Sequence, residues 1–109
     1  MRLGVVGMMP ADFRDITAAH LAAIADLRLT GAASHAPIAG LTDVTSAQCA
    51  SVRATMEAAG MDFVQFGLGY GQCLFDPDPA VTAPLLDGIG RGIEVAAQLQ
   101  AHYCLIRTG

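Results

Sequence analysis

Residues 62–107 read DFVQFGLGYGQCLFDPDPAVTAPLLDGIGRGIEVAAQLQAHYCLIR, and this stretch decides the fold. It begins with an aromatic and β-branched run, residues 62–67, that is typical of a strand. A connection rich in glycine and proline follows over residues 68–79, and apolar residues then recur at spacings of three and four over residues 81–99, which predicts a helix. Residues 102–107 predict a further strand. A strand, a helix and a strand in succession indicate a parallel βαβ unit.

The same alternation precedes this unit. Residues 3–8 form a short β-compatible run, and residues 31–37 lie between a glycine stop and a proline, where a strand fits. One helix is predicted after Asp12, which can cap it, and another between Thr42 and a stop at Gly60. The expected buried stripes of the three helices are Phe13, Ile16, His20, Ile24 and Leu27; Cys49, Val52, Met56 and Ala59; and Val81, Leu85, Ile89, Ile93, Ala96 and Leu99. The predicted order is β-α-β-α-β-α-β.

Length and composition leave two readings of this pattern. Hydrophobic residues make up 53% of the chain and charged residues 15%, which is a large apolar load for 109 residues. A complete (β/α)8 barrel typically takes about 250 residues. The chain is therefore a small α/β domain in its own right or one part of a larger barrel. No linker or charge block divides it, so we treat residues 1–109 as one unit.

The charge and the cysteines limit the classes of function. The formal net charge of −4 offers no basic surface for a nucleic-acid backbone, so we expect no nucleic-acid partner. No apolar run approaches the roughly 20 residues that a membrane span requires, so we expect no membrane partner either. Cys49, Cys73 and Cys104 are far apart, which favours reduced thiols over a disulfide framework or a zinc site. We therefore predict a cytoplasmic protein.

Polar residues on the inward face of a parallel barrel, near the carboxyl ends of its strands, are candidates for a binding site. In the third predicted strand, alternation predicts that Val64 and Phe66 face the helices. Phe63, Gln65 and Gly67 then face the lumen. Gln65 is suited to hydrogen-bond a substrate hydroxyl, although neighbouring side chains could satisfy a lumen glutamine instead.

The fourth predicted strand places an arginine at the same end of the barrel. Alternation sends Cys104 and Ile106 to the helices and Tyr103, Leu105 and Arg107 to the lumen. The guanidinium of Arg107 is suited to bind a phosphate or carboxylate on a sugar-like substrate. The alternative is a structural arginine in a salt bridge at the end of the strand.

Two further candidates lie in predicted loops. His35 precedes Pro37 and is expected in a rim loop, where it binds substrate or is simply solvated. The run Gly67-Leu68-Gly69-Tyr70-Gly71 lacks both the spacing and the following helix of a dinucleotide-binding fingerprint. We predict instead a mobile rim loop that closes over substrate, with Tyr70 as its aromatic contact.

The run 76–79, Asp-Pro-Asp-Pro, leads into the long helix, and the run 96–109 follows from the end of that helix. Together they resemble the third strand, third helix and fourth strand of the xylose isomerase-like barrel superfamily, which includes sugar phosphate isomerases, sugar epimerases and endonuclease IV-like proteins. The resemblance covers the whole chain in the order of its elements, but its motifs lie in the last third. It implies an α/β fold that is the N-terminal half of a (β/α)8 TIM barrel.

The resemblance also implies chemistry for the full-length protein. That chemistry is proton transfer next to the carbonyl of a sugar or sugar phosphate, assisted by a divalent metal (Mn, Mg or Zn) held at later strands. No metal ligand or catalytic residue of the superfamily maps onto this chain, so we expect the segment alone to be inactive. The alternative is a non-catalytic small α/β binding module. We also predict possible self-association through the open barrel edge.

Overall fold

The computed structural model describes residues 4–108 and gives the predicted order of elements. The predicted first strand began at Leu3, which lies outside the described residues. The strands are β1 (Gly4–Val5), β2 (Gly31–Pro37), β3 (Asp62–Gly69) and β4 (Tyr103–Leu105). The helices are α1 (Ala18–Asp26), α2 (Ser46–Ala58) and α3 (Pro79–Gln98), with the 3-10 turns η1 (Phe13–Asp15) and η2 (Ile38–Gly40). No helix within residues 4–108 is long and apolar enough to cross a membrane.

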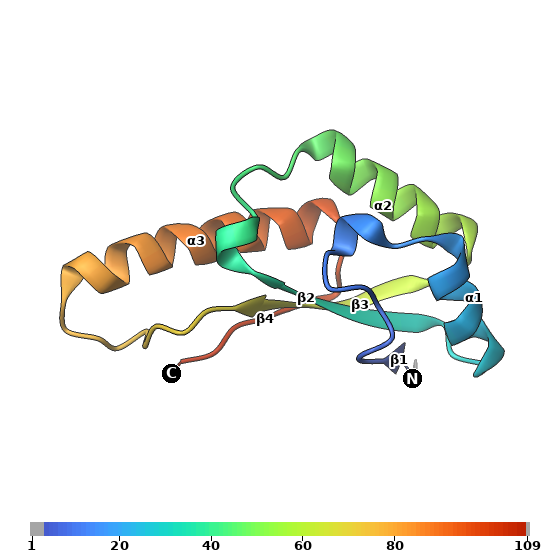
Figure 1. Ribbon diagram of the computed structural model, residues 1–109, viewed down its shortest axis with the longest axis horizontal. Helices are drawn as coiled ribbons and strands as arrows, with labels where there is room; N and C mark the ends of the chain where they lie inside the picture. Colours follow the sequence, from blue (N-terminus) through green and yellow to red (C-terminus); the bar gives the residue numbers. More distant parts are fainter. Residues whose placement is uncertain (1–3, 109) are drawn as a thin grey trace.

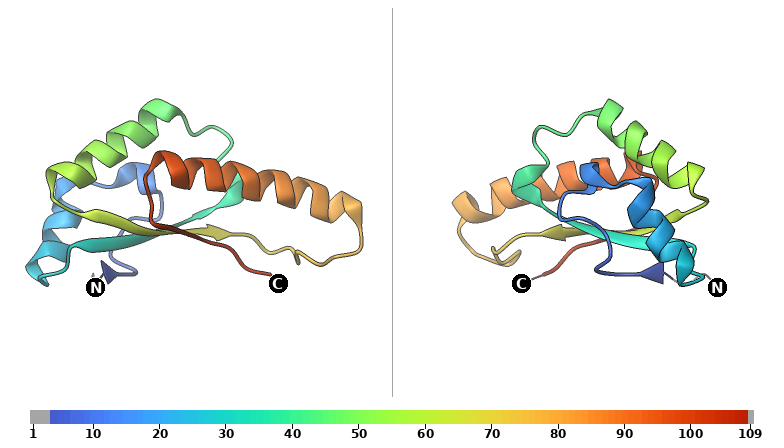
Figure 2. Two further views of the ribbon diagram at one scale, coloured as in Figure 1. Left: turned by 180° about the vertical axis from the view of Figure 1, so that it is seen from behind. Right: turned by 45° about the vertical axis from the view of Figure 1, so that its right-hand side comes forward.

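The four strands form one parallel sheet in the order β1-β2-β3-β4. Each crossover advances by one strand in the same direction, and right-handed crossovers of that kind place successive helices on the same face of a sheet. Figure 1 and Figure 2 show α2 and α3 on one side of the sheet and no helix on the opposite side. We call that opposite side the open face. A sheet covered on one side only is the arrangement of part of a (β/α)8 barrel, which confirms the predicted α/β fold class.

The core lies between the sheet and the helices and is centred on an aromatic cluster. Phe66 is fully buried and its ring meets Phe13 at 5.3 Å and Phe63 at 6.0 Å between centroids, both edge to face. The prediction that Phe63 faces the lumen is therefore wrong. The register shifts between Ala32 and Ala33, so that Val64 has no partner on β2 and both phenylalanines point toward the helices.

The strand boundaries also differ from the predicted ones. β3 continues to Gly69 rather than ending at Gly67, because β2 continues beside it to Pro37 and offers backbone partners. Glycines that suggested a loop are therefore part of the sheet. β4 covers only Tyr103–Leu105, so Arg107 follows the strand rather than lying in it.

The predicted first helix is divided into two pieces. Asp12 caps η1, and its hydrogen bond to Arg14 holds the pKa of the Asp12 carboxyl below its usual value. Ile16 has extended backbone dihedrals that end this turn, and α1 starts afresh after Thr17, whose N–H donates to His20 Nδ1 at 3.0 Å. Leu27 was expected in the buried stripe but is 55% exposed.

Two glycines of α3 allow close packing against the sheet and η2. A Cβ added to Gly92 would lie 2.5 Å from Leu68 Cδ1, and one added to Gly88 would lie 2.8 Å from Ile38 Cδ1. Gly90 has nothing within 4 Å of an added Cβ. The buried face of α3 therefore runs through Gly92 rather than through Ile93, which is 50% exposed.

We expect Gly92→Val to destabilise the chain by about 1–3 kcal/mol, because the added carbons overlap the buried Leu68 side chain. The matched control is Gly90→Ala on the same helix, which should be neutral or stabilising by up to about 1 kcal/mol because the added methyl meets open space. Urea unfolding followed by circular dichroism measures both. Equal midpoints for the two variants would contradict the proposed packing of Gly92.

Candidate functional site

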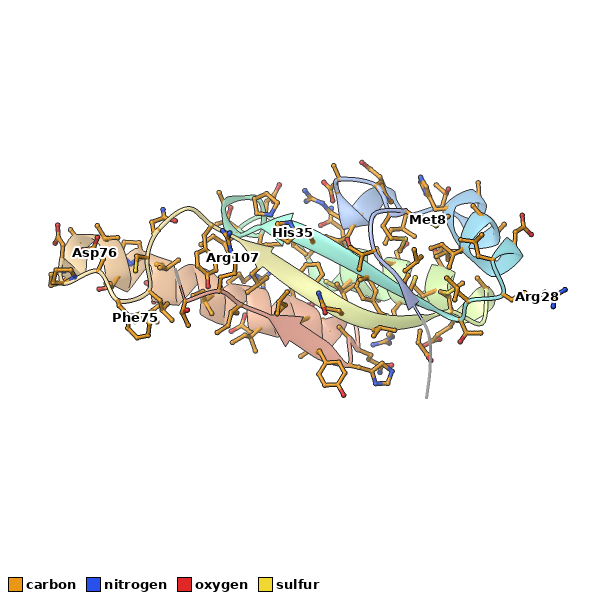
Figure 3. All side chains as sticks on the ribbon, turned by 90° about the horizontal axis from the view of Figure 1, so that it is seen from below. Met8, Arg28, His35, Phe75, Asp76 and Arg107 are labelled. Carbon is orange, nitrogen blue, oxygen red and sulfur yellow. The ribbon has the colours of Figure 1, made fainter. Side chains whose placement is uncertain are left out.

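The side chains of the open face are arranged in rows across the strands. Paired residues of parallel strands point to the same side of a sheet, and β3 pairs Gln65 with Tyr103 and Gly67 with Leu105. On the other side β3 pairs Gln65 with Ala33 and Gly67 with His35. The open face thus carries one row through Gln65 and a second row, nearer the carboxyl ends of the strands, through His35. Figure 3 views the molecule from this side.

A hollow of about 390 Å³ lies between these rows and the connection that follows β1. The connection contributes Val6, Met9 and Pro10 among others, and the sheet contributes His35 and Gln65. The hollow therefore joins an apolar wall to an imidazole and an amide at the end of the sheet where barrel sites form. Sequence alternation placed Gln65 here correctly.

His35 is part of strand β2 and not of a rim loop, which corrects the predicted location. Its imidazole is exposed on the open face and lies over β3, so that Cδ2 comes 3.0 Å from a Cβ built on Gly67 and Cε1 comes 2.6 Å from one built on Gly69. Within residues 4–108 the His35 side chain has no hydrogen-bond partner. Both ring nitrogens are therefore available to a ligand.

Gln65 is half-buried in the row below His35, and its amide likewise makes no hydrogen bond to another described residue. Ser34 also borders the hollow, but it pairs with Phe66, so its side chain points to the helix side of the sheet and not into the open face. Its Oγ is buried and has no hydrogen-bond partner among residues 4–108. Serine in a strand gives no distinctive sequence signal, because only the packing around it shows whether its hydroxyl is satisfied.

Arg107 and Tyr70 contact each other rather than the hollow. The Arg107 backbone N–H donates to Tyr70 Oη at 2.8 Å, the Tyr70 hydroxyl donates to the Arg107 carbonyl, and the Arg107 guanidinium donates to the Tyr70 carbonyl. The guanidinium also lies 5.8 Å from the centre of the Tyr70 ring. Figure 3 shows Arg107 beside the connection that follows β3.

These contacts hold the connection between β3 and α3 in place. Tyr70 is only 8% exposed, and further along the connection the Leu74 N–H donates to the Thr108 carbonyl at 3.0 Å. The run that was predicted to be a mobile rim loop, with Tyr70 as its aromatic contact to substrate, is thus bonded at Tyr70 to the residues after β4. Its closure over substrate stays a prediction. Substrate binding by Arg107 or Tyr70 stays a prediction.

The described residues do not fit the divalent metal that the resemblance implies. No group of three or more His, Cys, Asp or Glu side chains within residues 4–108 is close enough together to hold a metal ion. Burial raises the pKa of the Cys49 and Cys104 thiols, which disfavours the thiolate that metal binding or nucleophilic attack requires. We derive no step through a metal from these residues.

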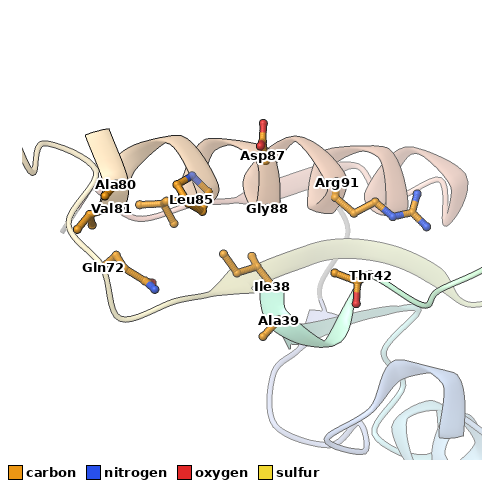
Figure 4. Close-up of a pocket in the computed structure, with 11 residues that line it drawn as sticks. Ile38, Ala39, Thr42, Gln72, Ala80, Val81, Leu85, Asp87, Gly88 and Arg91 are labelled. Atoms are coloured by element: carbon orange, nitrogen blue, oxygen red, sulfur yellow. The ribbon is translucent and has the colours of Figure 1, made fainter. Parts of the chain in front are cut away.

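A second hollow, of about 580 Å³, lies between η2 and the first half of α3 (Figure 4). Its lining includes Ile38, Val81 and Leu85. Arg91 also lines it, but its guanidinium donates to the Leu41 and Val44 carbonyls and to Glu94, so this cation supports the chain rather than a ligand. Figure 4 shows Asp87 pointing away from the space. Thr42 and Gln72 also line this second hollow without a hydrogen bond to another described residue. The hollow on the open face is the better candidate because it lies on the inward face of the sheet near the carboxyl ends of the strands, where barrel sites form.

No protein-family model and no curated protein sequence matches the chain. A crystal structure of D-psicose 3-epimerase in the presence of D-fructose is similar, with a TM-score of 0.71 at 18% sequence identity. The match covers 95% of this chain and 36% of the epimerase chain, so this chain spans about a third of the length of that protein. The likeness at this identity establishes the fold: four strands and three helices arranged as in part of a (β/α)8 barrel.

Proposed function

We propose that this chain forms part of the sugar-binding wall of a barrel enzyme that isomerises or epimerises a sugar. The observation that carries the proposal is the pair His35 and Gln65 on the open face, which line a hollow and have no hydrogen-bond partner among residues 4–108. The structural likeness to an epimerase supports the same class of reaction.

The chemistry of the hollow suits a neutral polyol. Imidazole and amide groups both donate and accept hydrogen bonds, as sugar hydroxyls do, and Leu105 and Met9 offer apolar surface to the C–H groups of a sugar ring. No Lys or Arg is among the residues that line the hollow within the described part of the chain, which favours a free sugar over a sugar phosphate. A phosphate contact at Arg107 is the secondary proposal.

The chain's own residues would bind and orient the sugar in this proposal. The divalent metal stays an expectation drawn from the resemblance, and none of residues 4–108 is assigned to hold it. Since the chain covers about a third of the similar epimerase, proton transfer itself is assigned to no residue here.

The test measures the binding of D-psicose, D-fructose and fructose 6-phosphate to the full chain by ligand-observed NMR. We expect His35→Ala or Gln65→Leu to raise Kd for the free ketoses about three- to tenfold, because one hydrogen bond contributes about 0.5–1.5 kcal/mol. His102→Ala is the matched control, since this exposed histidine precedes β4 at the other end of the sheet.

Absence of ketose binding at high millimolar concentration, or equal effects of the His35 and His102 variants, would contradict the proposal. Tighter binding of the phosphorylated sugar that is lost in Arg107→Ala would move the proposed substrate to a sugar phosphate.

A further inference from the structure

Glycine occupies every second position at the end of β3 and just after it. The three glycines are Gly67, Gly69 and Gly71, and the first two lie in the strand. A spacing of two places side chains on the same face of a strand, so a Cβ on Gly67 or Gly69 would project from the open face. Glycine weakens a strand interior because it loses more backbone freedom on folding and contributes no packing. Two glycines at alternate positions therefore point to something that approaches the strand closely.

The group that approaches is the imidazole of His35. A Cβ on Gly67 would lie 3.0 Å from His35 Cδ2, and a Cβ on Gly69 would lie 2.6 Å from Cε1 and 3.1 Å from Nε2. The distance to Cε1 is well below the carbon–carbon separation of about 3.5–4.0 Å at which two atoms attract. Gly71, by contrast, has nothing within 4 Å of an added Cβ.

We propose that Gly67 and Gly69 are positioning residues, which let the His35 imidazole lie against β3 and so orient it toward a sugar hydroxyl in the open-face hollow. This inference rests on the proposed function for the identity of the ligand, but the geometry of the ring is independent of it. No hydrogen bond to a described residue holds the ring, so the shape of the strand surface decides its orientation.

The position of the ring also determines the space left for a ligand. His35 and Gly67 both line the hollow. With a side chain at position 67 or 69, the ring must leave the sheet, and the free direction is toward the hollow and the solvent. An added methyl would therefore misdirect the ring nitrogens and fill part of the space that the sugar needs.

The experiment is a double-mutant cycle on the full chain with Gly69→Ala, His35→Ala and the two combined, and with Gly71→Ala as matched control. Three quantities are measured: the His35 Cε1–H NMR signal, the Tm, and Kd for D-psicose. Gly69→Ala should shift the His35 signal and raise Kd by the same factor as His35→Ala, whereas Tm should change little, because the exposed imidazole can turn away from the added methyl. In the His35→Ala background it should change neither Tm nor Kd appreciably, because the clashing ring is gone. Gly71→Ala should leave all three unchanged.

An unshifted His35 signal in Gly69→Ala, or an equal rise in Kd with and without the histidine, would overturn the positioning role. If the unmodified chain binds no ketose, the proposed function fails, whereas the NMR signal still decides the positioning of the ring. If Gly69→Ala does not fold, the same cycle is measured with Gly67→Ala, whose added Cβ would lie 3.0 Å from His35 Cδ2.

Discussion

Phe66→Ala should destabilise the chain by about 3–5 kcal/mol, which is a large fraction of the roughly 5–15 kcal/mol that stabilises a typical domain. Phe66 is fully buried between the sheet and the helices, and the rings of Phe13 and Phe63 contact it edge to face. Truncation removes the apolar burial of the ring, both aromatic contacts and the packing around them. Urea unfolding followed by circular dichroism measures the loss.

Phe75→Ala is the matched control for this substitution, since Phe75 is 76% exposed and its truncation should change stability by less than about 0.5 kcal/mol. Where Phe66→Ala does not fold, Phe66→Leu keeps most of the volume and should cost about 1.5 kcal/mol or less. Equal unfolding midpoints for the Phe66 and Phe75 variants would show that the aromatic cluster is not the centre of the core.

The second large effect concerns association of the chain through the open face. Val6 is 77% exposed, Tyr103 70% and Leu105 51%, and the last two belong to β4, which is an edge strand with unpaired backbone groups. Exposed apolar surface next to an open strand edge favours pairing with a second copy. We therefore expect dimers or larger species whose population rises with concentration, and binding of a dye that reports exposed apolar surface.

The combined substitution Tyr103→Lys and Leu105→Lys should shift the chain to a monomer, because charges on an edge strand oppose pairing with another edge. Leu86→Lys is the control, because Leu86 is 58% exposed but lies on helix α3 and not on the edge strand. Size-exclusion chromatography with light scattering measures the mass of each variant. An unmodified chain that is monomeric and binds no dye would contradict this expectation. If the double-lysine variant and Leu86→Lys have equal masses, the chains do not associate through β4.

Periodicity alone predicted the order of the elements and most of the core. The apolar spacing of α2 predicted Cys49, Val52, Met56 and Ala59 as buried, and the first three are, whereas Ala59 is exposed at the C-cap. Alternation along β3 placed Gln65 and Gly67 on the inward face, and the register confirms both positions. These features are local: a repeat of 3.6 or 2 residues determines which side chains share a face of a regular helix or strand.

The features that local patterns missed depend on contacts between strands. A bulge at Val64 turns Phe63 toward the helices, and it exists only because β2 and β3 pair with shifted register. Gly69 was predicted to lie in the connection after the strand, but it is part of β3 because β2 continues beside it.

By itself the sequence determined an α/β chain of alternating elements with polar residues at the ends of its strands. Only the tertiary structure decided what those residues do. It bonds Arg107 to Tyr70, and it places His35 over two glycines without a hydrogen bond to any residue in the range 4–108. The physical reason is that a hydrogen bond or a close approach between residues far apart in the chain depends on the distance between their atoms, and that distance is set by the packing of the whole sheet.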